Sequence, residues 1–166
     1  MAMIKVVRFE DISLGDVKAL CDGLPFKTEV VDGIGVPEKA YNSERRQYLA
    51  DYFIDEIKKL EGRVLGVTGV DLYAPGLNFI FGEAEMNGRA CVISVFRLNG
   101  ERKIFISRAV KEAVHEIGHT IGLMHCHNPL CVMHFSNCLA DTDIKNAWYC
   151  PRCERLVKNE IDELMK

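Results

Sequence analysis

The spacing of apolar residues predicts strands and helices that follow one another in the order β-α-β-α-β, before a group of short strands. Apolar and β-branched residues dominate 3–9, which predicts a first strand. Residues 13–24 have the spacing of a short helix that ends before Pro25. Residues 26–31 predict a second strand, followed by an Asp-Gly turn at 32–33. This order is typical of a mixed sheet backed by helices.

A second helix is predicted to begin at Asn42 or Ser43 and to run to Leu60, because its apolar positions recur at helical spacing. The later strands are predicted at 63–73, 78–81, 83–86 and 89–97. The pair Asn87-Gly88 favours a tight hairpin between the last two of them. The middle of the chain therefore adds several short strands to the sheet.

The C-terminal third begins with a periodic helix that Ser107 is predicted to cap and Gly122 to end. An irregular stretch to about residue 140 follows, then a short helix over 141–148 and a charged amphipathic helix from 151. We expect an α+β fold in one domain over 1–166. It would have an N-terminal subdomain over 1–122 and a smaller C-terminal subdomain over 123–166.

Composition narrows the class of protein. Hydrophobic residues make up 48% of the chain, an ordinary globular balance, and 166 residues can bury a core large enough to fold without disulfides. The net charge of -3 disfavours a nucleic-acid partner. Lys5, Arg8 and Glu10 interrupt the first apolar run, which argues against a signal peptide, and no apolar run approaches the ~18 residues of a membrane span. We expect a cytoplasmic monomer with no membrane partner.

Five residues near the end of the third helix form a metal-binding pattern. His115 and His119 are one turn apart on the same helical face, so both imidazoles can reach one ion. Gly122 allows a sharp turn that brings His125 back toward that ion. Three neutral histidines leave one coordination position of a zinc ion open for water. Glu116 can reach that water without binding the metal.

These residue types predict hydrolysis of peptide bonds. Zinc lowers the pKa of a bound water to ~7, and Glu116 can take its proton as the water attacks a carbonyl carbon. Glu116 is therefore the predicted catalytic residue, and the three histidines are the predicted ligands of a catalytic zinc. Cobalt or nickel would also suit three imidazoles.

Cysteines supply a second pattern. Two pairs have the spacing of a closed tetrahedral zinc site, and they consist of Cys126, Cys131, Cys150 and Cys153. Four thiolates leave no position for a substrate, so this second zinc would be structural. A redox pair or ordinary buried thiols are the alternatives. Cys138 is left over, and His127 and His134 are possible substitute ligands.

The pattern His-Glu-x-x-His-x-x-Gly-x-x-His with a downstream methionine, Met133, resembles the metzincins. Cys126 directly after the third histidine, followed by the other three cysteines, resembles one branch of them, the archaemetzincins (archaelysins). The resemblance implies a zinc metallopeptidase with a twisted mixed sheet, a backing helix, an active-site helix and a small C-terminal subdomain. It also implies that Met133 lies in a turn under the zinc, and that a peptide lies along an edge strand, for which 78–82 is our candidate.

Two other functions compete with the peptidase. A non-catalytic zinc-containing module could bind a peptide or protein in the same cleft, but binding alone would not need Glu116 beside the ion. A zinc-ribbon nucleic-acid binder would account for the four cysteines only, and the acidic net charge disfavours it. The sequence does not indicate which side chains a substrate carries.

Overall fold

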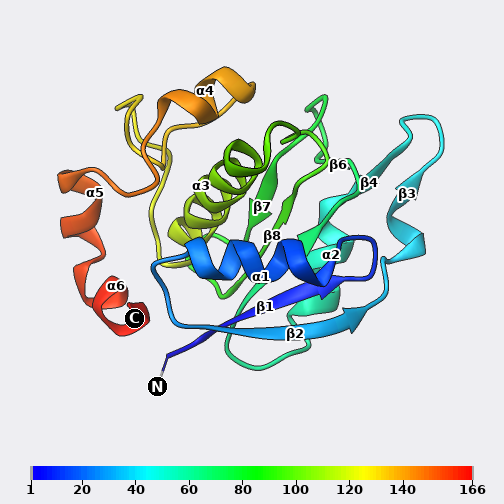
Figure 1. The fold of residues 1–166 in the computed structure, drawn as a ribbon, viewed down its shortest axis with the longest axis horizontal. Helices are drawn as coiled ribbons and strands as arrows, with labels where there is room; N and C mark the ends of the chain where they lie inside the picture. Colours follow the sequence, from blue (N-terminus) through cyan, green and yellow to red (C-terminus); the bar gives the residue numbers. More distant parts are fainter. Residues whose placement is uncertain (1, 166) are drawn as a thin grey trace.

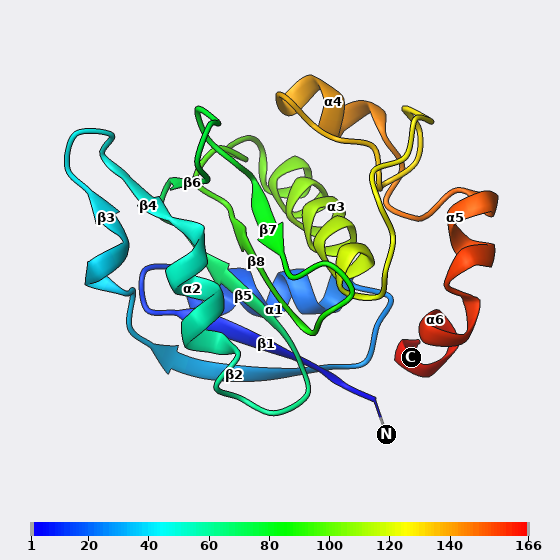
Figure 2. The same ribbon diagram turned by 180° about the vertical axis from the view of Figure 1, so that it is seen from behind.

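The computed structural model describes residues 2–165, which form a five-stranded mixed sheet with helices on both faces and a small three-stranded sheet beside it (Figures 1 and 2). The strands are β1 Ile4–Phe9, β2 Thr28–Ile34, β3 Tyr41–Asn42, β4 Gln47–Leu49, β5 Arg63–Thr68, β6 Leu72–Tyr73, β7 Gly82–Ala84 and β8 Ala90–Ser94. The helices are α1 Leu14–Gly23, the 3-10 turn η1 Glu38–Ala40, α2 Ala50–Ile57, α3 Arg102–Thr120, α4 Leu139–Ile144, α5 Pro151–Leu156 and α6 Lys158–Leu164. The predicted α+β class is confirmed.

The large sheet has the strand order β2-β1-β5-β8-β7. Its first four strands are parallel, whereas β7 runs antiparallel to β8 and forms one edge. The predicted hairpin is confirmed, because Asn87 and Gly88 join these two strands, with Asn87 in the left-handed region at φ 52°. Its N–H donates to the carbonyl of His119 at 2.8 Å, which ties the hairpin to the end of α3.

Two hydrophobic clusters lie on opposite faces of this sheet. Helices α1 and α3 cover one face, and α2 covers the other (Figures 1 and 2). Phe9 and Phe53 pack edge to face at 5.0 Å between the sheet and α2, and both are fully buried. Each such side chain contributes about 1.5–3 kcal/mol through burial. Helix α3, on the other face, contacts β8 and β7 and so lies beside the β7 edge.

The predicted helix from Asn42 or Ser43 is wrong in its first half. Residues 41–49 form the β3–β4 hairpin, and Arg46 takes a left-handed turn conformation at φ 56°. Helix α2 begins only at Ala50. Tyr48 fits the helical spacing, but in the structure it pairs with Tyr41 and Leu72, so tertiary strand pairing overrides the local pattern.

Three further boundaries differ from the prediction. Residues 78–81 form no strand, because only Ile80 makes an isolated bridge, to Leu72. The Asp-Gly pair at 32–33 lies inside β2, where the pairing with β1 is irregular, instead of forming a turn after it. Helix α3 begins five residues before Ser107, at Arg102, because Phe105 and Ile106 pack against the core and extend the helix.

The chain after α3 runs through an irregular loop into α4, α5 and α6, which lie along the side of the molecule that carries α3 (Figure 1). Lys27 donates its N–H to the carbonyl of Leu164 at 2.9 Å and so fixes the last helix near the start of β2. Among residues 2–165, no helix combines the length and the apolarity that crossing a bilayer requires.

Candidate metal centres and cleft

Helix α3 and the turn after it bring three histidines together. His115 and His119 share one buried face of α3, and Gly122, at φ 106°, ends the helix so that His125 turns back toward them. The ligand atoms of all three lie within 4.8 Å of one another, and the Nε2 atoms of His115 and His119 are 3.1 Å apart. Nitrogens bound to one tetrahedral zinc lie about 3.3 Å apart, so the triad fits such an ion.

Backbone carbonyls orient the two helical imidazoles. Nδ1–H of His115 donates to the carbonyl of Val132 at 2.7 Å, and Nδ1–H of His119 donates to that of Leu123 at 2.7 Å. Each Nε2 is thereby left unprotonated and directed to the centre of the triad. Burial lowers the pKa of His115 well below its usual value and that of His119 to about 4. Both rings are therefore neutral near pH 7, as metal binding requires.

Glu116 lies beside the triad and outside the set of three converging nitrogens. It packs against β7 so closely that a Cβ at Gly82 would lie 2.8 Å from its Cγ and 2.7 Å from the carbonyl of Val92. Only glycine fits at this position. Burial raises the pKa of the Glu116 carboxyl well above its usual range, with Glu112 adding to the effect. Glu116 thus combines a fixed position with a high proton affinity.

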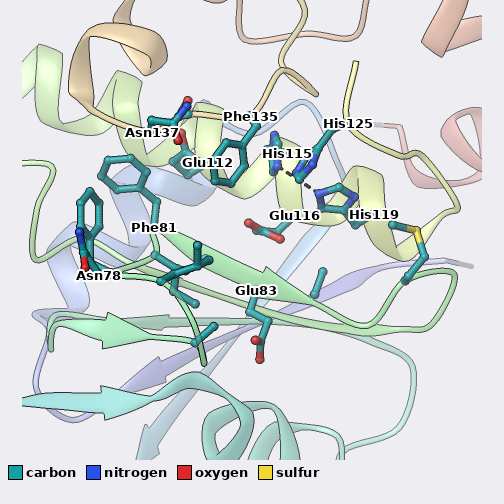
Figure 3. Close-up of a pocket in the computed structure, with 18 residues that line it drawn as sticks. Asn78, Phe81, Glu83, Glu112, His115, Glu116, His119, His125, Phe135 and Asn137 are labelled. Carbon is teal, nitrogen blue, oxygen red and sulfur yellow. Dashed lines mark hydrogen bonds between the residues drawn. The ribbon is translucent and has the colours of Figure 1, made fainter. Parts of the chain in front are cut away.

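The histidine triad opens into a cleft of about 430 Å³ between α3, the β7 edge and the loop after Met133 (Figure 3). The β7 side of the cleft is formed by Leu77, Asn78, Phe79, Ile80, Phe81, Gly82, Glu83 and Ala84. The opposite side is formed by Phe135, Ser136 and Asn137. Arg45 donates to the carbonyl of Leu77 at 2.6 Å and so holds the rim of the cleft from the β3–β4 hairpin.

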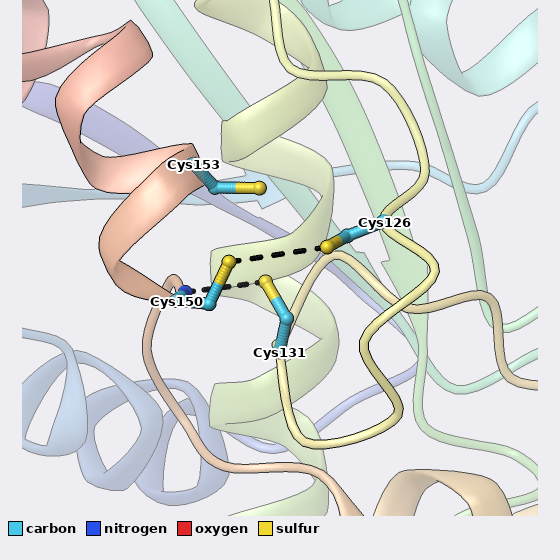
Figure 4. Close-up of side chains that lie close together, drawn as sticks. All are labelled: Cys126, Cys131, Cys150 and Cys153. Carbon is cyan, nitrogen blue, oxygen red and sulfur yellow. Dashed lines mark hydrogen bonds between the residues drawn. The ribbon is translucent and has the colours of Figure 1, made fainter.

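The four predicted cysteines converge beside α3, between the loop that follows it and α5 (Figure 4). Cys126 and Cys131 come from the loop after α3, and Cys150 and Cys153 from the start of α5. Their sulfurs lie within 4.8 Å of one another, with 3.9 Å between those of Cys126 and Cys150. Sulfurs on one tetrahedral zinc lie about 3.8 Å apart, so this cluster also fits the ion. A hydrogen bond from the Cys153 N–H is the main cause that lowers the Cys150 pKa to about 7.

One loop connects the two clusters. The N–H of Cys126 donates to the carbonyl of Met133 at 3.0 Å, and His134 donates from Nδ1 to the carbonyl of Cys126 at 2.8 Å. The same loop supplies the Val132 carbonyl that orients His115. Met133 is fully buried and packs against Gly118 of α3, where a Cβ would overlap its sulfur. A displacement of this loop would therefore reach both clusters.

Other residues considered from the sequence lie outside the two clusters. His127 and Cys138 are exposed, and His134 is held by the Cys126 carbonyl. The buried Tyr149 donates its hydroxyl to the carbonyl of Val114 at 2.9 Å, so this group is directed into α3 and away from the cleft.

Glu112 lines the cleft and Lys145 is buried in contact with it, but neither was expected from the sequence. Glu112 was detectable, because it precedes His115 by three residues and so shares the helical face of the histidines. No sequence signal indicated Lys145. Its Nζ lies 3.4 Å from the Glu112 carboxylate, a contact that depends on the fold of the C-terminal loop.

The chain is similar to a known class of enzymes, the zinc metallopeptidases. The profile of Peptidase family M54 matches residues 16–159, so the chain belongs to this family of zinc metallopeptidases. The resemblance to archaemetzincins in the sequence is confirmed by named relatives. Archaemetzincin of Methanocaldococcus jannaschii is 41% identical over 156 residues, which cover 90% of this chain and 83% of that protein.

Crystal structures of two archaemetzincins have the same fold as this chain. The crystal structure of archaemetzincin from Methanopyrus kandleri superposes with a TM-score of 0.88 at 37% identity, and the match covers 97% of this chain and 96% of that one. That of archaemetzincin from Archaeoglobus fulgidus gives 0.81 at 41% identity, covering 92% of this chain and 99% of that one. Both share the fold over nearly the whole chain.

Proposed function

We propose that this zinc metallopeptidase cleaves peptide bonds at the histidine triad, with His115, His119 and His125 holding the catalytic zinc and Glu116 acting as general base. The observation that carries the proposal is the convergence of three neutral imidazoles on one point beside a buried carboxylate. A purely binding cleft would not need that carboxylate.

A zinc ion held by the triad would supply Lewis-acid chemistry, making a water nucleophilic near neutral pH and polarising the substrate carbonyl. Glu116 would take the proton from the attacking water and pass it to the leaving amine. Its contact with Gly82 fixes the carboxylate beside the triad. The carbonyls of Val132 and Leu123 keep the ligand nitrogens aimed at the ion throughout.

We also propose a second, structural zinc bound by Cys126, Cys131, Cys150 and Cys153. Four sulfurs that converge at the spacing of a tetrahedral zinc site support four-thiolate binding. Such an ion has no open position for a substrate, so its contribution would be to hold the loop that orients His115.

The substrate would pair with the β7 edge. In the β7–β8 ladder, Phe81, Glu83 and Glu85 hydrogen-bond toward β8, so the N–H and C=O groups of Gly82 and Ala84 turn outward. An extended peptide can add to these groups as a further strand. The candidate edge 78–82 accordingly shifts to 82–84, because Ile80 is paired with Leu72.

The test is a mass-spectrometric digest of a diverse peptide library by zinc-loaded protein, beside Glu116→Gln and a control, Glu154→Gln on the exposed side of α5. Zinc content is measured in all three. We expect cleavage by the wild type and the control, and a rate at least ~100-fold lower for Glu116→Gln with zinc retained. Equal cleavage by Glu116→Gln would refute the general-base assignment. No cleavage by any of the three would favour the binding module.

A further inference from the structure

The cleft extends beyond His115, on the side away from His119, into a region that we call the side pocket, lined by Phe81, Glu112, Phe135, Ser136 and Asn137. Figure 3 shows Glu112 between Phe135 and Asn137, and Phe81 on the side of β7. A substrate bound along β7 at the metal centre would direct a side chain into this region. The residues of the side pocket therefore bear on which substrates fit.

Glu112 is unusual because its side chain is buried but only one of its two carboxylate oxygens has a protein partner. The residue is 3% exposed, and its Oε1 accepts a hydrogen bond from the Thr142 hydroxyl at 2.9 Å and faces the Lys145 ammonium at 3.4 Å. Among residues 2–165, no hydrogen bond goes to Oε2. Oε2 is not fully enclosed by the protein, so it can accept a hydrogen bond from a bound ligand that brings a donor into the cleft.

Lys145 determines the charge of the donor that fits. Its side chain is 0% exposed, and it donates to the His134 carbonyl at 3.1 Å in addition to its contact with Glu112. The Glu112 charge is therefore already balanced, and a cationic side chain would add an uncompensated positive charge. A neutral donor avoids this penalty. Phe81 and Phe135 offer aromatic surface that suits a flat ring.

We propose that the side pocket selects a substrate residue whose apolar body ends in a neutral hydrogen-bond donor, tyrosine above all, with Oε2 of Glu112 as the acceptor. The inference rests on the proposed peptidase function and names the substrate class of that site. Glu112 is here a specificity-determining residue, and Lys145 is a positioning residue that holds its carboxylate and balances its charge.

The first experiment uses peptides that are cleaved by the wild type and carry tyrosine, phenylalanine or lysine in turn at each position flanking the cleaved bond. At the position that enters the side pocket, we expect kcat/KM for tyrosine to exceed that for phenylalanine about tenfold, and lysine to be the poorest of the three. Equal values for tyrosine and phenylalanine at every position, or a preference for lysine, would overturn the proposal.

Variants then test the acceptor. In the double variant Glu112→Leu with Lys145→Met, both charges leave together and no unpaired ion remains buried. Its tyrosine-to-phenylalanine ratio should fall to about one, whereas Thr142→Val, which removes only the donor to Oε1, should keep it. A tenfold ratio that persists in the double variant would overturn the assignment of Glu112. If the double variant does not fold, the ratio of kcat/KM for the tyrosine and phenylalanine peptides in the wild type still tests the proposal.

Calorimetric binding to zinc-loaded Glu116→Gln separates this inference from the peptidase proposal. Tighter binding of the tyrosine peptide than of its phenylalanine twin would support the side pocket even if no peptide were cleaved. Cleavage by the wild type without this difference in binding would leave the peptidase standing and reject the side-pocket inference.

Discussion

Replacing Gly118 by alanine sets two opposing effects against each other within one helix. Alanine is favoured over glycine in a helix interior by about 1 kcal/mol. A Cβ at 118, however, would overlap the sulfur of Met133 and lie 3.0 Å from Cε1 of Tyr149. Both neighbours are buried, so neither can move aside into solvent. Overpacking of this kind costs about 1–3 kcal/mol, and the steric effect should win.

We expect a net loss of up to about 2 kcal/mol for Gly118→Ala, which for a chain of this size corresponds to a Tm lower by up to roughly 8 °C. The matched control is Gly15→Ala in α1, where the nearest atom to the new Cβ is Ser13 Oγ at 4.0 Å. That variant should gain up to about 1 kcal/mol.

Thermal unfolding in excess zinc measures both variants, because saturating metal keeps ligand loss from dominating the result. Competition with a chelator then gives zinc affinity at the histidine triad, which should fall in Gly118→Ala because displaced Met133 carries Val132 and its carbonyl with it. A Gly118→Ala protein as stable as Gly15→Ala, with unchanged zinc affinity, would refute the packing argument.

Two further predictions concern the second cluster and the edge strand. Cys150→Ser should lose one zinc and bind the remaining ion about tenfold more weakly, because the loop that orients His115 loosens. The control Cys138→Ser should keep both ions. Elemental analysis measures the zinc content and chelator competition the affinity, and full zinc affinity at the triad in Cys150→Ser would contradict the prediction. Burial and the Asp51 carboxylate raise the pKa of Glu83 from 4.5 to about 8. Between these two pH values the folded state binds more protons than the unfolded state, so the stability of the wild type falls as pH rises from 4.5 to about 8. Glu83→Gln should therefore raise Tm relative to the wild type above pH 8 and lose that advantage near pH 4.5, and a constant Tm difference across this range would count against the shifted pKa.

Much of the fold could be predicted, because local signals agree with tertiary packing in most elements. Ser13 caps α1 as its sequence position suggests, and its side chain accepts from the N–H of Asp16. The β7–β8 hairpin is closed by a hydrogen bond from the Glu85 N–H to the Ala90 carbonyl, and Asn87 in its loop takes the left-handed conformation that asparagine tolerates. The prediction failed around Tyr48, where aromatic residues at helical spacing pair across strands, since spacing alone cannot detect a distant partner such as Leu72.

The histidine triad was foreseeable for a different reason. Three ligand positions lie within one helix and its turn, so sequence spacing is almost spatial spacing there. The side pocket was not foreseeable, because its Glu112 contacts Lys145, thirty-three positions further along the chain, and this contact depends on how the intervening loop folds. Gly82 shows the same limit, since its need for glycine comes from Glu116 on another element.

Backbone carbonyls, those of Val132 and Leu123, orient the two imidazoles, and this affects how the protein tolerates mutation. A point mutation rewrites a side chain but leaves every peptide carbonyl in the chain. Neither acceptor can thus be deleted by a single amino-acid exchange, whereas an aspartate or asparagine in the same place could be. Relatives that diverge at 123 or 132 can keep well-aimed histidines, provided that their new side chains preserve the path of the backbone.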